Sequence, residues 1–98
     1  ARVSHKENAS GVKLYLRPTE LLIFGNPKLG THFFTSNQTA GIDLPMKALA
    51  WEDESGQVWL SYNDPAYLVS RHNMKGCDKV VNKVTKALGN FAKGATKP

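Results

Sequence analysis

The sequence predicts a single α+β domain in which helices pack against an antiparallel or mixed sheet. Its 98 residues are enough for one domain and too few for two. Short, mostly apolar runs at residues 20–25, 46–53 and 57–62 have the length and composition of strands. Residues 77–92 repeat apolar side chains every three to four positions, which is typical of a long amphipathic helix.

The beginning of the chain favours extended structure. Residues 1–6 are typical of the end of a strand, and residues 7–11 of a turn. Residues 12–16 alternate apolar and polar side chains, which predicts an extended segment. The run at residues 20–25 is nearly continuous in apolar side chains, which favours a strand covered on both faces.

Two proline-containing turns predict helix starts, because Asn26 precedes Pro27 and Asp64 precedes Pro65. Asn and Asp side chains accept hydrogen bonds from the exposed backbone N–H groups of a first helical turn. Proline at the first helical position lacks only an N–H that would have no partner there. We therefore expect one helix after the first turn and a second, short helix over residues 65–72.

A loop over residues 36–45 leads to a predicted β-hairpin. Asp53 and Gly56 occupy the first and fourth positions of a type I turn, with the glycine in the left-handed region. Strand pairing across this turn places Trp51 opposite Trp59. A cross-strand aromatic pair contributes roughly 0.2–1 kcal/mol, which would help to fix the register.

The last predicted helix, residues 77–92, has one apolar and one basic face, and residues 93–98 are expected to form a flexible tail. The apolar stripe comprises Val80, Val81, Val84, Ala87, Leu88, Phe91 and Ala92, and the basic face comprises Lys79, Lys83, Lys86 and Lys93. Basic amphipathic helices can lie on anionic membranes or bind acidic partners. The simpler interpretation is the solvated outer face of a packed helix.

Charge is distributed unevenly along the chain, whose net charge is +5. Residues 1–70 hold six Lys/Arg and seven Asp/Glu, a net charge of −1, whereas residues 71–98 hold seven Lys/Arg and one Asp, a net charge of +6. The neutral body argues against a nucleic-acid partner. No apolar run approaches the ~20 residues of a membrane span. The single cysteine rules out an internal disulfide, and a first residue other than Met favours a periplasmic protein over a cytoplasmic one.

Four motifs carry a resemblance to a known bacterial family. They are Gly25-Asn26-Pro27-Lys28, Gly41-x-Asp43-Leu44-Pro45, Trp51-Glu52-Asp53 and Tyr62-Asn63-Asp64-Pro65. Through them, residues 1–92 resemble the family called domain of unknown function 302. The resemblance implies a compact α+β domain that pairs as a homodimer and has no established activity. It also implies that a first strand and helix of the family are missing here, which would leave a sheet edge in need of a partner.

The proline turns also supply the predicted ligand site, which comprises Gly25, Asn26, Lys28, Asn63 and Asp64. Helix N-termini present free N–H groups and a partial positive charge, and the lysine adds a full charge. If both turns emerge at one end of the sheet, they could converge on a small anionic ligand. The turns lack the glycines of a nucleotide-phosphate motif. The alternative interpretation is two ordinary helix caps.

A metal site is the second candidate, with His72, Met74 and Cys77 as ligands. Imidazole, thioether and thiolate together suit copper, whereas the spacing matches no standard zinc pattern. In the alternative interpretation, Met74 and Cys77 pack as apolar groups beside a helix start, and His72 closes the preceding helix. The sequence itself requires no cofactor.

Acid–base or nucleophilic chemistry is the third candidate. Asp43, Asp64 and His72 could meet in space, and Cys77 near a helix start could be a reactive thiol. We predict a non-enzymatic small-ligand-binding or protein-interaction module that acts as a homodimer. A metal or redox-associated protein is the alternative function, and an enzyme of unknown reaction is the third.

Overall fold

The computed structural model describes residues 1–25 and 27–96, and for Pro27, Lys28, Leu29 and His32 it describes the backbone only. The chain divides into two compact units. The sheet unit comprises Ala1–Phe24 and Met46–Tyr62, and the helical unit comprises Gly25–Pro45 and Asn63–Pro98. The fold class is α+β, as predicted.

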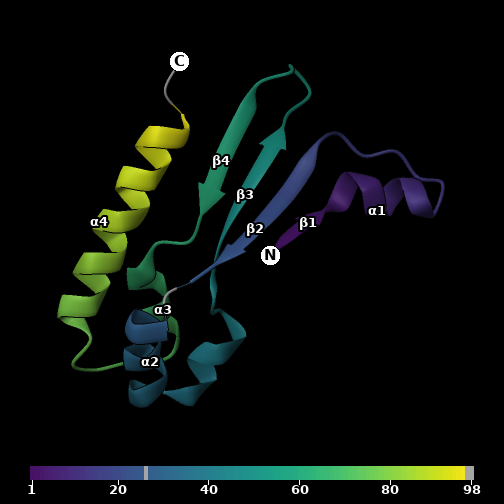
Figure 1. The fold of residues 1–98 in the computed structure, drawn as a ribbon. Coiled ribbons are helices and arrows are strands. Elements are labelled where there is room, and N and C mark those ends of the chain that lie inside the picture. The colour runs from purple at the N-terminus through teal and green to yellow at the C-terminus, as the bar shows by residue number, and fades with distance from the viewer. Residues whose placement is uncertain (26, 97–98) are drawn as a thin grey trace. The chain divides into compact units, whose positions relative to one another are not determined.

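The sheet unit contains four strands, and every neighbouring pair is antiparallel (Figure 1). In sheet order they are β1 (Arg2–Ser4), β2 (Thr19–Phe24), β3 (Met46–Glu52) and β4 (Val58–Tyr62). The sequence predicted either an antiparallel or a mixed sheet, and the sheet in the structure is antiparallel. The three predicted strands that follow residue 19 are confirmed to within one residue at either end.

The hairpin between β3 and β4 has the predicted turn. The backbone N–H of Asp53 donates to Gln57 O at 2.9 Å, and Gly56 adopts the left-handed region with a φ of 81°. Trp51 lies opposite Trp59 in the register, and the two rings stack with centroids 6.2 Å apart and planes inclined by 23°. The predicted aromatic pair is therefore confirmed.

Helix α1 (His5–Gly11) stands where the sequence predicted the end of a strand and a turn. Ser4 caps this helix, because its Oγ accepts a hydrogen bond from the backbone N–H of Glu7 at 3.2 Å. Glu7 also places a carboxylate in the first turn, where the partial positive charge of the helix favours it. The helix contacts β2 of the same unit.

Residues 12–16, predicted as an extended segment, pair with no strand of the described part of the chain. The N–H of Leu14 instead donates back to Ala9 O at 2.9 Å, which closes the end of α1. The side chains of Val12, Leu14 and Tyr15 are 67%, 66% and 83% exposed. Alternation misleads here because a strand needs a neighbouring strand to receive its backbone hydrogen bonds.

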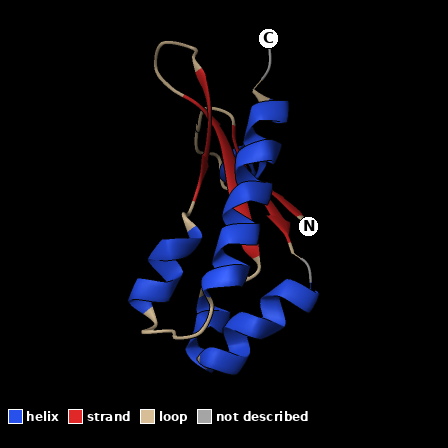
Figure 2. Cartoon of the chain, turned by 90° about the vertical axis from the view of Figure 1, so that its left-hand side faces the viewer, coloured by secondary structure: helices blue, strands red, loops and turns tan. Residues whose placement is uncertain are grey.

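The described residues of the helical unit form three α-helices and one 3₁₀ helix (Figure 2). They are α2 (Pro27–Ser36), η1 (Gln38–Ile42), α3 (Pro65–Arg71) and α4 (Asp78–Ala95). Helix α2 contacts η1 and α4, and α3 contacts α4. Among the described residues, the buried apolar side chains of this unit include Phe33, Ala40, Pro65, Leu68, Met74, Cys77, Val84 and Leu88.

Two boundaries in the helical unit differ from the sequence prediction. The predicted loop at residues 36–45 contains η1, which Asn37 caps by accepting a hydrogen bond from Thr39 N–H at 3.0 Å. Helix α4 ends three residues later than predicted, so residues 93–95, expected in the flexible tail, are helical. None of the helices in the described part of the chain has the length and hydropathy that a membrane span requires.

Candidate functional site

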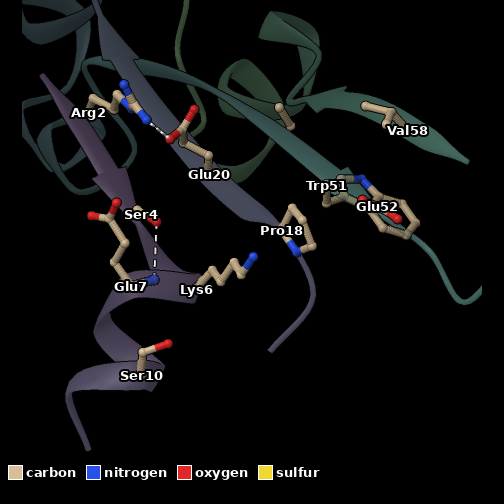
Figure 3. A pocket seen from close by; sticks show the side chains of 11 residues that line it. Arg2, Ser4, Lys6, Glu7, Ser10, Pro18, Glu20, Trp51, Glu52 and Val58 are labelled. Atoms are coloured by element: carbon tan, nitrogen blue, oxygen red, sulfur yellow. Dashed lines mark hydrogen bonds and ion pairs between the residues drawn. The ribbon is translucent and has the colours of Figure 1, made fainter. Parts of the chain in front are cut away.

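The sheet unit contains a cavity of about 490 Å³ between α1 and one face of the sheet (Figure 3). Its lining comprises Arg2, Ser4, Lys6, Glu7, Ser10, Pro18, Glu20, Ala50, Trp51, Glu52 and Val58. The antiparallel register explains how the strands build this lining. Ser4 lies opposite Glu20, Glu20 lies opposite Ala50, and Glu52 lies opposite Val58, so these side chains share one sheet face.

Helix α1 supplies the other wall of the cavity. Its first two turns contribute Lys6, Glu7 and Ser10, and the cap at Ser4 joins this wall to the end of β1. Figure 3 shows the bond from the Glu7 N–H to Ser4 that holds this corner. The local signal for this arrangement was present in the sequence, since Ser followed by Glu three positions later is the capping-box pattern.

The charges that line the cavity are only partly paired. Arg2 Nε donates to Glu20 Oε1 at 2.6 Å, and this ion pair is partly exposed. Within the described residues, the side chains of Lys6, Glu7 and Glu52 have no ion-pair partner. Two cations thus face three carboxylates, which leaves the cavity with a formal charge of −1. Such a site favours a ligand with a positively charged group.

A second polar cluster lies in the helical unit, centred on His72. This residue is the C-cap of α3 and is 8% exposed. Its Nε2 lies 2.6 Å from Asp43 Oδ2, and its Nδ1 lies 3.0 Å from Thr39 Oγ1. Arg71 Nη1 donates to both carboxylate oxygens of Asp43, at 2.8 and 3.0 Å. The structure therefore brings Asp43 and His72 together, two of the three residues of the predicted acid–base site. Asp64, the third residue, serves as a helix cap.

The order of groups in this cluster is hydroxyl, imidazole and carboxylate, which is the order used by nucleophilic catalytic sites. The Thr39 hydroxyl also donates to Asn37 Oδ1 at 2.9 Å, so Asn37 and the imidazole compete for the hydroxyl proton of Thr39. Asn37 Nδ2 in turn donates to His72 O at 2.7 Å. These bonds tie η1 and the loop after it to the end of α3, so the cluster acts first as a structural connection within the helical unit.

The predicted anion site falls largely outside the described residues. Asn26 is not described, and the side chain of Lys28 is not described either. Gly25 and Asn63 are exposed, and Asp64 caps α3 by accepting a hydrogen bond from Ala66 N–H at 2.9 Å. Pro65 occupies the start of that helix, as predicted. The convergence of the two turns on a ligand stays a prediction.

The predicted metal ligands lie close together in the chain but have other contacts. Met74 and Cys77 are buried, Cys77 Sγ donates to Lys75 O at 3.6 Å, and both ring nitrogens of His72 face hydrogen-bond partners. Across residues 1–25 and 27–96, no group of three His, Cys, Asp or Glu side chains gathers as it would around a metal ion. The metal site stays a prediction.

Comparison with known proteins identifies related chains. The family described as "Domain of unknown function DUF302" matches residues 1–91. The chain is 55% identical over 73 residues to the fluoride-specific ion channel FluC 1 of Brucella suis and to that of Brucella abortus. Each match covers 74% of this chain, but only 29% and 27% of the two channels. The chain thus spans less than a third of the length of these relatives.

A solved structure shows the same fold. The crystal structure of an uncharacterized conserved protein DUF302 from Bacillus stearothermophilus superposes on this chain with a TM-score of 0.82. The superposition covers 95% of this chain and 73% of the other, at 20% sequence identity. At that identity, the likeness shows the fold alone.

Proposed function

The chain belongs to the DUF302 family, and we propose that it is a non-enzymatic module that binds a small ligand and acts as a homodimer. The observation that carries the ligand proposal is the cavity of the sheet unit. Its volume of about 490 Å³ falls within the roughly 300–1,000 Å³ of known small-molecule sites. The walls combine apolar surface with a few charged groups, which is the usual composition of such sites.

The class of ligand follows from the lining of this cavity. Pro18, Ala50 and Val58 offer apolar surface, while Glu7 and Glu52 offer carboxylates without an ion-pair partner among the described residues. A primary amine on a short carbon chain matches both features, because its ammonium group pairs with a carboxylate while its chain covers the apolar surface. We therefore propose a small organic amine as the ligand.

The test compares three four-carbon probes, n-butylammonium, butyrate and n-butanol, by amide chemical-shift titration. We expect n-butylammonium alone to shift the amides of α1 and of Ala50 to Glu52. Glu52→Gln should weaken its binding roughly two- to fivefold, the effect of one partly exposed charge pair. Glu54→Gln is the matched control, since Glu54 lies two residues away, outside the lining, and pairs with Arg17. Equal shifts with n-butanol, or an equal loss in both variants, would refute the proposal.

A small anion at the proline turns is a second candidate, which the relatives favour. The matched channels are fluoride-specific, and fluoride is a small anion of the kind proposed for Gly25, Asn26, Lys28, Asn63 and Asp64. Because the chain covers less than a third of each channel, we propose for it only the binding of the anion. The free N–H groups at a helix start and one lysine would supply that binding.

Fluoride titration of the intact chain tests this second candidate, with chloride as the comparison ion. We expect fluoride to shift the amides around residues 25–28 and 63–66, and Lys28→Ala to weaken this binding several-fold, as expected for the loss of one charge-assisted bond. Lys75→Ala is the control, because Lys75 is an exposed lysine of the same unit. Unchanged fluoride affinity in Lys28→Ala would remove the site.

The homodimer proposal is supported by strand β4. Among the described strands, β4 ends the sheet and pairs only with β3, so the backbone groups on its other edge have no strand partner there. Val58, Trp59 and Tyr62 of β4 are large apolar side chains that remain exposed. A second copy of the chain that pairs along β4 would cover both the edge and these side chains.

A further inference from the structure

We propose that the lysine face of α4 docks the chain on the surface of an anionic lipid membrane. The face consists of Lys79, Lys83, Lys86 and Lys93, all of them exposed. At 3.6 residues per turn, these four positions fall within an arc of about 80° on the helix. Val84 and Leu88, the buried residues of α4, lie on roughly the opposite side. The face therefore points away from the packed side of the helix.

The positive charge of this face is not neutralised within the described chain. None of the four lysines has an ion-pair partner among the described residues. Asp78 is the last acidic residue of the sequence. Lys79 and Lys83 stand four positions apart, and Lys83 and Lys86 three, so the like charges repel one another along the helix. An anionic surface would relieve this repulsion.

The shape and composition of the face favour lipid over nucleic acid. From Lys79 to Lys93 the face extends about 21 Å at 1.5 Å per residue, as a straight row. Helix α4 contains no arginine to form forked bonds with phosphates, and Asn90 rather than an aromatic residue stands among the lysines. Phe91, the aromatic residue of α4, lies about 120° from the row of lysines, so it is not placed to stack on bases beside them.

The same features distinguish docking on the membrane surface from insertion into it. An inserting amphipathic helix buries bulky apolar side chains beside its charged face. On the surface of α4, the positions that share or border the lysine face are polar or small, among them Asn82, Asn90 and Gly94. Attraction between lysines and anionic headgroups accounts for binding without insertion, and it weakens as salt screens the charges.

Vesicle flotation with the full chain tests the proposal. We expect binding to phosphatidylcholine vesicles that contain about one-third phosphatidylserine, and none to pure phosphatidylcholine, at about 0.1 M salt. Raising the salt to about 0.5 M should release the chain. The triple variant Lys79→Gln, Lys83→Gln, Lys86→Gln should lose binding on the order of 100-fold, about fivefold for each lysine.

Two further variants separate the effect of the lysine face on membrane binding from the effect of net charge. Lys13→Gln, Arg17→Gln, Lys47→Gln removes the same charge from the sheet unit at residues outside the cavity lining and should retain most of the binding. Replacing the three helix lysines with arginine keeps the charge and should retain binding as well. An equal loss in the sheet-unit variant, no binding to the anionic vesicles, or tighter binding to an oligonucleotide than to the vesicles at equal salt would each overturn the proposal.

Discussion

A single carboxylate organises the hairpin between β3 and β4. The indole N–H of Trp59 donates to Asp53 Oδ2 at 2.9 Å, while Asp53 Oδ1 accepts from the backbone N–H groups of Ser55 and Gln57 at 2.9 and 3.0 Å. The Trp59 bond is the largest cause that holds the pKa of Asp53 below its usual value of 3.8, and the two backbone bonds and Arg17 act in the same direction. Each of these contacts favours the ionised carboxylate.

This lowered pKa predicts how the hairpin responds to acid. Because the folded state depresses the pKa of Asp53, the carboxylate adds stability above the unfolded pKa and loses that contribution as the pH falls through the folded value. We expect Asp53→Asn to be less stable than the parent near pH 6 and to lose less of its remaining stability between about pH 5 and pH 2. Urea unfolding followed by tryptophan fluorescence at both ends of this range measures the difference.

Glu54→Gln provides the control for the acid experiment, because Glu54 is an exposed carboxylate of the same turn. Its pH profile should follow that of the parent chain. If Asp53→Asn showed the same loss of stability on acidification as the parent, the hydrogen bonds of Asp53 would not be the acid-sensitive element.

Other residue contacts could not be predicted from the sequence. Asp43 and His72 are 29 positions apart, and Thr39 and His72 are 33 apart, yet their polar atoms lie within hydrogen-bond distance. The sequence indicated that Asp43 and His72 could meet, but it gave no reason to include Thr39 or Asn37. Such contacts depend on how η1 and α3 pack, and no local pattern specifies that packing.

The elements that the sequence predicts correctly are those specified by local chemistry. The turn at Asp53 and Gly56 needs only a carboxylate and a left-handed residue at fixed positions. The start of α3 needs only Asp64 followed by proline. In each case the residues that specify the element lie within five positions of one another, so the pattern can be read directly from the sequence.

The segment of residues 5–16 shows where a local pattern misleads. Residues 12–16 alternate and were predicted to be extended, and residues 5–11 were predicted as the end of a strand and a turn, whereas the Ser4 cap and Glu7 start a helix immediately after β1. The capping pattern specifies α1 because a cap is satisfied within one turn. A strand also requires a partner, and the described strands provide none for residues 12–16.

The cavity of the sheet unit is lined by residues from many elements of the chain. Its lining draws on β1, α1, β2, β3, β4 and the chain before β2, from Arg2 to Val58. Individual strands were predictable, but the face on which Glu20, Ala50 and Glu52 meet is set by the register between strands. The unpredicted helix α1 forms the remaining wall, so the sequence prediction could not have located this site.

The last prediction concerns assembly, since we expect two chains to pair along β4. The strand has five residues, against three for β1 at the opposite edge, and therefore offers the longer edge for main-chain hydrogen bonds. Light scattering at micromolar concentration should give a mass of twice 10.8 kDa. Tyr62→Lys should shift the equilibrium to the monomer, because a charged side chain on an edge strand opposes strand pairing.

Tyr67→Lys distinguishes this interface from a general effect of added charge. Tyr67 is 51% exposed on α3, and Tyr62 is 40% exposed on β4, so the two substitutions make the same chemical change at similarly exposed positions. We expect only the β4 variant to dissociate. A parent chain with the mass of a monomer would contradict the homodimer itself, whereas dissociation of both variants would reflect a general effect of added charge and contradict a contact specific to β4. Dissociation of Tyr62→Lys alone would identify the β4 edge as the dimer contact.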